Sequence, residues 1–156
     1  IRDVVDQNDD VEIIFPVHLN PRVQQTADQI LGDDPKIHLI DPLDVVDFHN
    51  LAARSYFIMT DSGGVQEEAP SLGKPVLVLR DTTERPEGIE AGTLKLVGTD
   101  PQIITQTMQA LLTDDHLYQA MATAKNPYGD GFAAQHIIEA IKYHFKITAT
   151  LPPLFE

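Results

Sequence analysis

Short apolar runs alternate along the chain with longer segments whose apolar residues recur every three or four positions. The short runs are rich in β-branched, aromatic or leucine side chains, which is typical of buried strands. These predicted strands cover residues 11–17, 37–40, 56–60, 75–79 and 93–97.

The longer segments predict amphipathic helices because their apolar residues fall on one face. The predicted helices cover residues 1–8, 21–31, 44–54, 62–72, 101–112, 115–124 and 132–145. Asp130 is the expected N-cap of the last of them. Pro70 lies inside a predicted helix and should kink it, because proline lacks the amide hydrogen.

Strands that alternate with helices and are almost continuously apolar indicate a parallel sheet covered on both faces. The predicted fold is therefore α/β, a doubly wound, Rossmann-like parallel sheet. Residues 1–8 have helical spacing with no start signal before them, so we expect a helix whose beginning was cut off and at least one more strand upstream. Ligands of such sheets bind outside the carboxyl ends of the strands.

Composition narrows the function classes. The 156 residues include 11 Lys or Arg and 24 Asp or Glu, giving a formal net charge of −13. This charge argues against partners such as duplex DNA or an anionic membrane, which need a basic face. Cysteine is absent, which removes disulfides, thiol nucleophiles and cysteine-based zinc sites. The histidines have no metal-binding spacing, and no Ser-His-Asp order appears, so we expect no metal.

The strongest local signal is the segment YFIMTDSGGVQEEA at residues 56–69, where a strand runs into Asp61-Ser62-Gly63-Gly64 and then a helix. The first amides of a helix lack intrahelical partners and carry roughly +0.5 charge. Two glycines allow close approach of an oxyanion, and a serine adds a donor, so the turn fits a phosphate. The alternative is an ordinary helix cap with glycines that only shape the turn.

Further candidates lie in and around the same predicted edge. Glu68 can reach the sugar side of a nucleotide bound there, whereas Glu67 fits a solvated face that complements the helix dipole. The segment RDTTERPEG at residues 80–88 brings Arg80 and Arg85 to the end of the next strand. The planar fork of arginine suits phosphate, although surface Arg–Glu pairing is the alternative. His18, in PVHLNP, is either a ligand contact, a capping residue or a buried hydrogen-bonded residue.

Four segments together resemble the bacterial non-hydrolysing UDP-N-acetylglucosamine 2-epimerases: PVHLNP, the block TDSGGVQEEAPSLGKPVLVLRDTTERPEG, LVGTD and NPYGDG. Their order and spacing also resemble that family, over residues 1 to about 146. The resemblance implies one half of a two-domain architecture of the glycosyltransferase-B type. Residues 1–146 would form the UDP-binding carboxyl-terminal domain, truncated at its start, and residues 147–156 a tail, with the amino-terminal catalytic domain absent.

The resemblance also implies roles for individual residues. Ser62, Gly63 and Gly64 would bind the diphosphate, Glu68 the ribose hydroxyls, and Arg85 the ligand near the phosphates. Phe48 would lie against the uracil, although it also fits the apolar face of its own helix.

The backbone near Leu43 would pair with the edge of the uracil, and the family often has Gln at this position. His18 resembles a histidine near the cleft that is associated with a second, activating UDP-sugar.

The implied reaction interconverts UDP-GlcNAc and UDP-ManNAc by elimination and re-addition of UDP, without cofactor or metal. The acid and base groups would lie in the missing part, so the fragment alone should be inactive. A cytoplasmic homodimer that feeds cell-envelope polysaccharide synthesis is implied for the full-length protein. The alternatives are the donor domain of a UDP-sugar glycosyltransferase and a non-catalytic nucleotide-sugar sensor.

Overall fold

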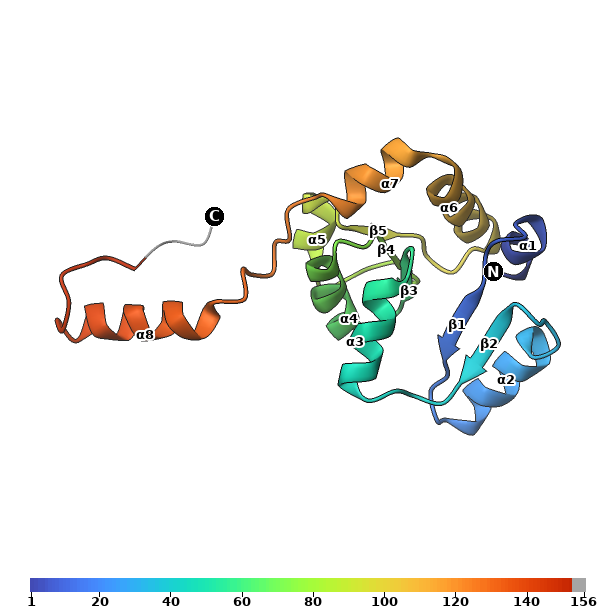
Figure 1. Ribbon diagram of the computed structural model, residues 1–156, viewed down its shortest axis with the longest axis horizontal. Helices are drawn as coiled ribbons and strands as arrows, with labels where there is room; N and C mark the ends of the chain where they lie inside the picture. Colours follow the sequence, from blue (N-terminus) through green and yellow to red (C-terminus); the bar gives the residue numbers. More distant parts are fainter. Residues whose placement is uncertain (153–156) are drawn as a thin grey trace.

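The computed structural model describes residues 1–152 as five short parallel strands surrounded by helices (Figure 1). The strands are β1 (Ile13–Pro16), β2 (Ile37–Ile40), β3 (Ile58–Thr60), β4 (Val76–Val78) and β5 (Leu94–Leu96). The helices are α1 (Arg2–Gln7), α2 (Pro21–Leu31), α3 (Val45–Arg54), α4 (Gly63–Glu68), the 3-10 helix η1 (Ala69–Leu72), α5 (Pro86–Ala91), α6 (Pro101–Thr113), α7 (Asp115–Ala122) and α8 (Ala133–His144).

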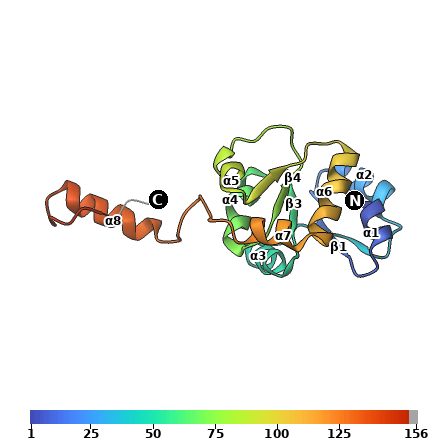
Figure 2. The same ribbon diagram turned by 90° about the horizontal axis from the view of Figure 1, so that it is seen from above.

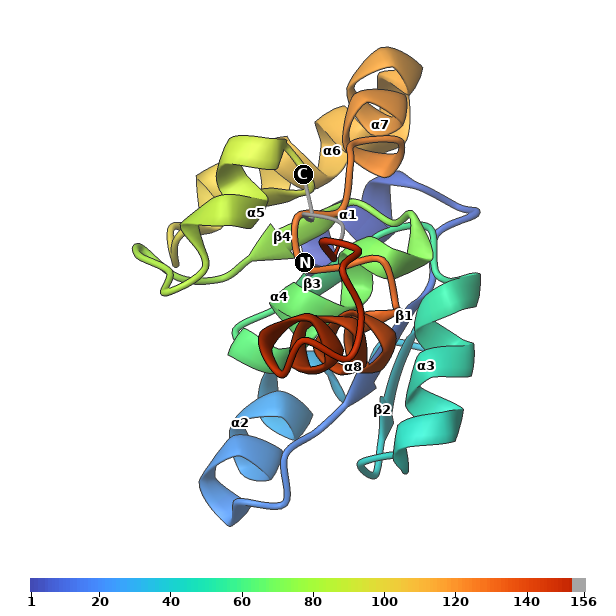
Figure 3. The same ribbon diagram turned by 90° about the vertical axis from the view of Figure 1, so that its left-hand side faces the viewer.

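The strands pair in two parallel ladders. β1 pairs with β2, and β4 lies between β3 and β5. Both ladders contribute to one core, because Ile13 of β1 and Met59 of β3 pack against the cluster that contains Leu77 of β4 and Leu111 of α6. Figure 3 shows α3 on one side of the strands and α5 on the other. The predicted α/β class with parallel strands is confirmed, with the five strands divided between two ladders.

Capping residues fix where several helices begin. Asp44 accepts from the amides of Val46 and Asp47 at 2.9 Å each, so α3 begins directly after it. Asn20 accepts from the amide of Arg22 at 3.0 Å at the start of α2. These caps satisfy amides that have no intrahelical partner.

The helix predicted over residues 62–72 changes at Ala69 from α4 to the 3-10 helix η1. The change lies next to Pro70, where the sequence predicted a kink, because proline cannot donate to the helical ladder. The sequence predicted no helix at residues 80–88, but α5 begins within this segment at Pro86, where proline is tolerated in the first turn, and Gly92 ends it at φ 82°.

The last helix, α8, extends away from the remainder of the molecule (Figures 1 and 2). None of its residues is buried. The prediction that Asp130 is the N-cap of α8 was wrong, because the N-cap is Phe132. The Phe132 amide donates to Asp130 Oδ1 at 2.8 Å, so Asp130 orders the turn before the helix. Of the predicted tail at residues 147–156, the last four residues lie outside the described part of the chain.

Candidate functional site

The turn after β3 leads directly into α4. Ser62 caps this helix with extended backbone (φ −82°, ψ 130°), and its amide donates to Thr60 Oγ1 at 3.0 Å. The Ser62 hydroxyl makes no capping bond to the helix. The amides of Gly63 and Gly64 belong to the first turn, where no intrahelical acceptor is available. The hydroxyl and these amides are therefore placed to donate to an anion.

A hollow of about 400 Å³ opens beside this turn. Its walls come from α4, from α3 and from the segment that precedes α3. The lining residues are Leu43, Val45, Phe48, Ser62, Gly64, Val65 and Glu68. The structure thus brings together Leu43, Phe48, Ser62, Gly64 and Glu68 of the residues predicted from the sequence. Gly63 is next to this group in the chain, whereas Arg85 and His18 do not line the hollow.

Glu68 faces the hollow from the last position of α4 and is half-exposed. Its Oε2 atom lies 3.0 Å from Nε2 of His49 on α3. The His49 ring is tilted against the Phe48 ring, with 6.0 Å between the ring centroids. A carboxylate held in this way can accept hydrogen bonds from paired hydroxyl groups, and the Phe48 ring can cover an aromatic base.

Arg85 connects the loop after β4 to α4 rather than standing free. Its Nε atom donates to Glu67 Oε1, and its Nη1 atom donates to the Glu84 carbonyl at 3.2 Å. Glu67 therefore has a specific partner, which corrects the expectation that it only complements the helix dipole on a solvated face. The guanidinium lies close to the turn, since a Cβ added at Gly63 would be 4.0 Å from Arg85 Nη2.

Glu84 lies between the two arginines of this loop. Its carboxylate accepts from Arg80 Nη1 at 2.8 Å, and one oxygen would be 2.5 Å from a Cβ added at Gly63. Hydrogen bonding to its own backbone amide lowers the pKa of Glu84, and the nearby charges of Arg80 and Arg85 lower it further. An ionised carboxylate next to the turn offsets part of the positive charge that the arginines bring.

Sequence reasoning did not single out three residues that join these elements. His49 contacts Glu68, and Gln66 and Thr83 are hydrogen-bonded to each other between α4 and the loop after β4. Each contact joins residues 17 or 19 positions apart, so local spacing carries no signal for it. A signal for Gln66 was its position three and four residues before Ala69 and Pro70, which puts it on the same face as two apolar residues.

His18 lies beyond the carboxyl end of β1 and is exposed. Its Nδ1 atom accepts from the Asn20 amide at 3.1 Å, just before α2. This bond agrees with the capping alternative, and contact with a second UDP-sugar stays a prediction.

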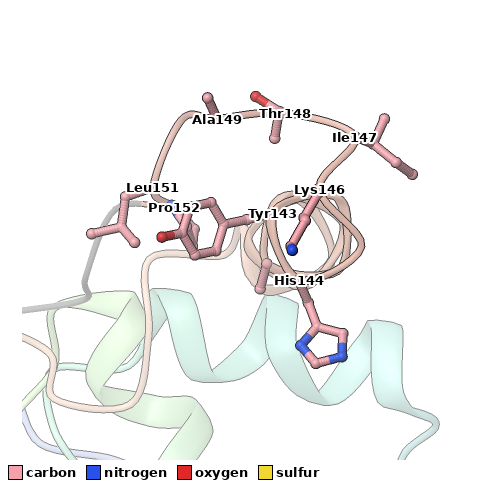
Figure 4. A pocket seen from close by; sticks show the side chains of 9 residues that line it. Tyr143, His144, Lys146, Ile147, Thr148, Ala149, Leu151 and Pro152 are labelled. Carbon is pink, nitrogen blue, oxygen red and sulfur yellow. The ribbon is translucent and has the colours of Figure 1, made fainter.

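A second hollow, of about 890 Å³, lies where the chain turns back over α8 (Figure 4). Its lining residues are Ala140, Tyr143, His144, Lys146, Ile147, Thr148, Ala149, Leu151 and Pro152. None of the predicted site residues belongs to it. Residues 1–152 contain no cluster of three or more histidine or acidic side chains suited to a metal ion. In the same range, no helix has the length and apolar character needed to cross a membrane.

The family model described as UDP-N-acetylglucosamine 2-epimerase matches residues 1–142. The chain belongs to this family. UDP-N-acetylglucosamine 2-epimerase of Bacillus subtilis (strain 168) is 58% identical over 155 residues, which are 99% of this chain and 41% of that protein. The chain therefore spans about two fifths of the length of this epimerase.

Solved epimerase structures have the same fold. The S. aureus MnaA–UDP co-structure has a TM-score of 0.92 and 54% identity, and the match covers 99% of this chain and 42% of that one. The epimerase from Neisseria meningitidis bound to UDP-GlcNAc has a TM-score of 0.85 and 44% identity, over 90% of this chain and 38% of that one. The fold of these relatives agrees with the glycosyltransferase-B type that the family resemblance implied.

Proposed function

We propose that residues 1–146 are the carboxyl-terminal, UDP-binding domain of an enzyme that interconverts UDP-GlcNAc and UDP-ManNAc. The observation that carries this proposal is that Leu43, Phe48, Ser62, Gly64 and Glu68 line the same hollow beside the turn after β3. Relatives that were solved with UDP and with UDP-GlcNAc support it.

Each part of the ligand has a matching part of the site. The diphosphate lies over Ser62, Gly63 and Gly64, where the donors of the turn neutralise its charge. Glu68 accepts from the ribose hydroxyls, and Phe48 covers the uracil. The Leu43 backbone faces the edge of the base.

Arg85 contributes positive charge near the phosphates from its position beside α4. Its side chain does not line the hollow but lies close to Gly63, since a Cβ added there would be 4.0 Å from Arg85 Nη2.

The chemical contribution of this domain is stabilisation of the leaving group. In the elimination, the bond between C1 of the sugar and the UDP oxygen breaks while C2 loses a proton. Re-addition of UDP to the unsaturated sugar, with protonation of C2 from the other face, gives the epimer. Donors fixed around the diphosphate stabilise the charge that develops on departing UDP. The acid and base that move the C2 proton belong to the remaining part of the protein.

The proposal includes the setting of the full-length protein. It is a homodimer that handles UDP-N-acetylhexosamines, and a nucleotide-sugar substrate favours a cytoplasmic location. This chain alone binds UDP without turnover.

The product formed by the full-length protein tests the proposal. Incubation with UDP-GlcNAc in deuterated water, followed by NMR, should show UDP-ManNAc with deuterium at C2 of the sugar, because the C2 proton is lost and replaced. Transfer of the sugar to an acceptor without formation of UDP-ManNAc would instead identify a glycosyltransferase. A protein that binds UDP-GlcNAc and leaves it unchanged would be a sensor.

A further inference from the structure

We propose that Gln66 is a positioning residue that holds the turn after β3 and the loop after β4 at a fixed spacing around the diphosphate. The inference rests on the proposed function, because both segments are taken to contact the same ligand. It assigns a role to a buried side chain that is not among the lining residues of the hollow.

Gln66 is fully buried in α4 and uses both ends of its amide. Its Nε2 atom donates to the Ser62 carbonyl at 3.2 Å, and its Oε1 atom accepts from Thr83 Oγ1 at 2.5 Å. The Thr83 oxygen in turn accepts from the backbone amide of Arg85 at 3.0 Å. Three consecutive hydrogen bonds therefore run from the backbone of Ser62 to the backbone of Arg85.

The donor and the acceptor of each of these three hydrogen bonds are fixed. The Ser62 carbonyl can only accept, so the amide nitrogen of Gln66 must face it. The Arg85 amide can only donate, so Thr83 uses its oxygen there and its single hydrogen for Gln66. Only one orientation of the Gln66 amide satisfies both the Ser62 carbonyl and the Thr83 hydroxyl. Because the amide holds both groups at hydrogen-bond distance, it fixes the spacing between the turn after β3 and the loop after β4.

The second connection between these segments is the ion pair of Arg85 with Glu67, whose side chains are both partly exposed. Partly exposed ion pairs are weakened by water and salt, whereas a buried polar group left without its partner is costly. The hydrogen bonds made by the buried amide of Gln66 therefore control the spacing. Arg85 is free to exchange Glu67 for a phosphate oxygen without losing its backbone position.

Thr83→Val is the sharpest test, because valine keeps the shape of threonine but neither donates nor accepts. UDP affinity, measured by calorimetry on this chain, should fall about tenfold, the effect of losing one well-placed charge-assisted bond. Affinity for uridine, followed by NMR, should stay unchanged, because the proposed uracil and ribose contacts lie on Phe48 and Glu68. Thr83→Ser keeps the hydroxyl and should restore the UDP affinity.

Gln66→Glu provides a second, nearly isosteric variant. The carboxylate can still accept from Thr83 but places an oxygen against the Ser62 carbonyl, so the UDP to uridine affinity ratio should fall again. In a double-mutant cycle, Arg85→Ala should cost less UDP affinity in the Thr83→Val background than in the unchanged chain. If Gln66 were merely structural, these substitutions would lower the melting temperature. The UDP to uridine affinity ratio would stay the same and the double-mutant cycle would be additive.

The outcomes separate the two proposals. If the unchanged chain binds UDP and a folded Thr83→Val chain retains the full preference for UDP over uridine, the positioning role is overturned and the proposed function stands. An additive double-mutant cycle would overturn it as well. If the unchanged chain does not bind UDP, the proposed function and the positioning role fail together.

Discussion

Replacing Gly64 by alanine should raise the thermal stability of the chain and lower its affinity for UDP. Gly64 is the second residue of α4, and a Cβ built there would meet only Ser62 Oγ, at the ordinary contact distance of 3.8 Å. The fold can therefore accept a methyl group at this position. The same methyl would project from a residue that lines the hollow, where the diphosphate is proposed to approach the helix.

The two effects can be estimated separately. Alanine is favoured over glycine in a helix by up to about 1 kcal/mol, which raises the melting temperature of a domain of this size by roughly 2–4 °C. A methyl group that keeps a phosphate oxygen from one backbone amide removes a bond to a charged group, which contributes about 1.5–3 kcal/mol. The expected loss in UDP affinity is therefore roughly 10- to 150-fold.

Thermal unfolding and calorimetric titration with UDP measure the two quantities on the same Gly64→Ala sample. Gly32→Ala is the opposite control, because its Cβ would lie 2.6 Å from the Asp28 carbonyl oxygen at the end of α2, away from the hollow. That variant should melt at a lower temperature and keep its UDP affinity. An unchanged UDP affinity in Gly64→Ala would refute the placement of the diphosphate over this turn.

Three further predictions concern other parts of the chain. Glu68→Ala should lower UDP affinity by roughly one order of magnitude without unfolding the chain, as should Ser62→Ala, because each removes one hydrogen bond to the ligand. The matched control is Glu12→Ala, which breaks the same carboxylate–histidine pairing, also at 3.0 Å, just before β1, and should leave binding unchanged. Burial raises the pKa of Tyr128 above its ordinary value of 10.0, so its contribution to stability is complete below pH 10 and is lost as the pH rises further. Tyr128→Phe should reduce that alkaline loss in thermal melts at successive pH values, and an identical pH profile would contradict the assignment. Finally, α8 exposes an apolar stripe, so the chain should associate as its concentration rises, and Ile141→Asp should reduce the association. A strictly monomeric mass in light scattering at all concentrations would disprove this.

The sequence predicted those parts of the fold that depend on local pattern. The run PVLVL predicted β4 because a strand in a parallel sheet is apolar on both faces. The polar composition of residues 80–88 concealed α5, although Pro86 at its start and Gly92 at its end are recognisable helix boundaries. The periodicity of residues 132–145 predicted a helix, but periodicity alone could not show that α8 would project from the domain.

The candidate site also has features that follow from local sequence and features that depend on tertiary packing. The turn at residues 62–64 could be predicted because a strand, two glycines and a helix follow one another directly in the chain. The pairing of His49 with Glu68 and the chain from Gln66 to Arg85 could not, because they depend on how α4 packs against α3 and against the loop after β4. The expectation for Glu67 failed for the same reason, since its partner Arg85 is 18 positions away.

Calorimetric titration of this chain with UDP, with UMP and ADP as controls, tests the central claim most directly. The account predicts that UDP binds more tightly than UMP, because the donors of the turn after β3 form hydrogen bonds with the second phosphate, which UMP lacks. It also predicts tighter binding than ADP, because the hollow at Leu43 and Phe48 selects the base. Equal affinity for UDP and ADP, or no binding of UDP, would contradict the claim that this chain carries a UDP site.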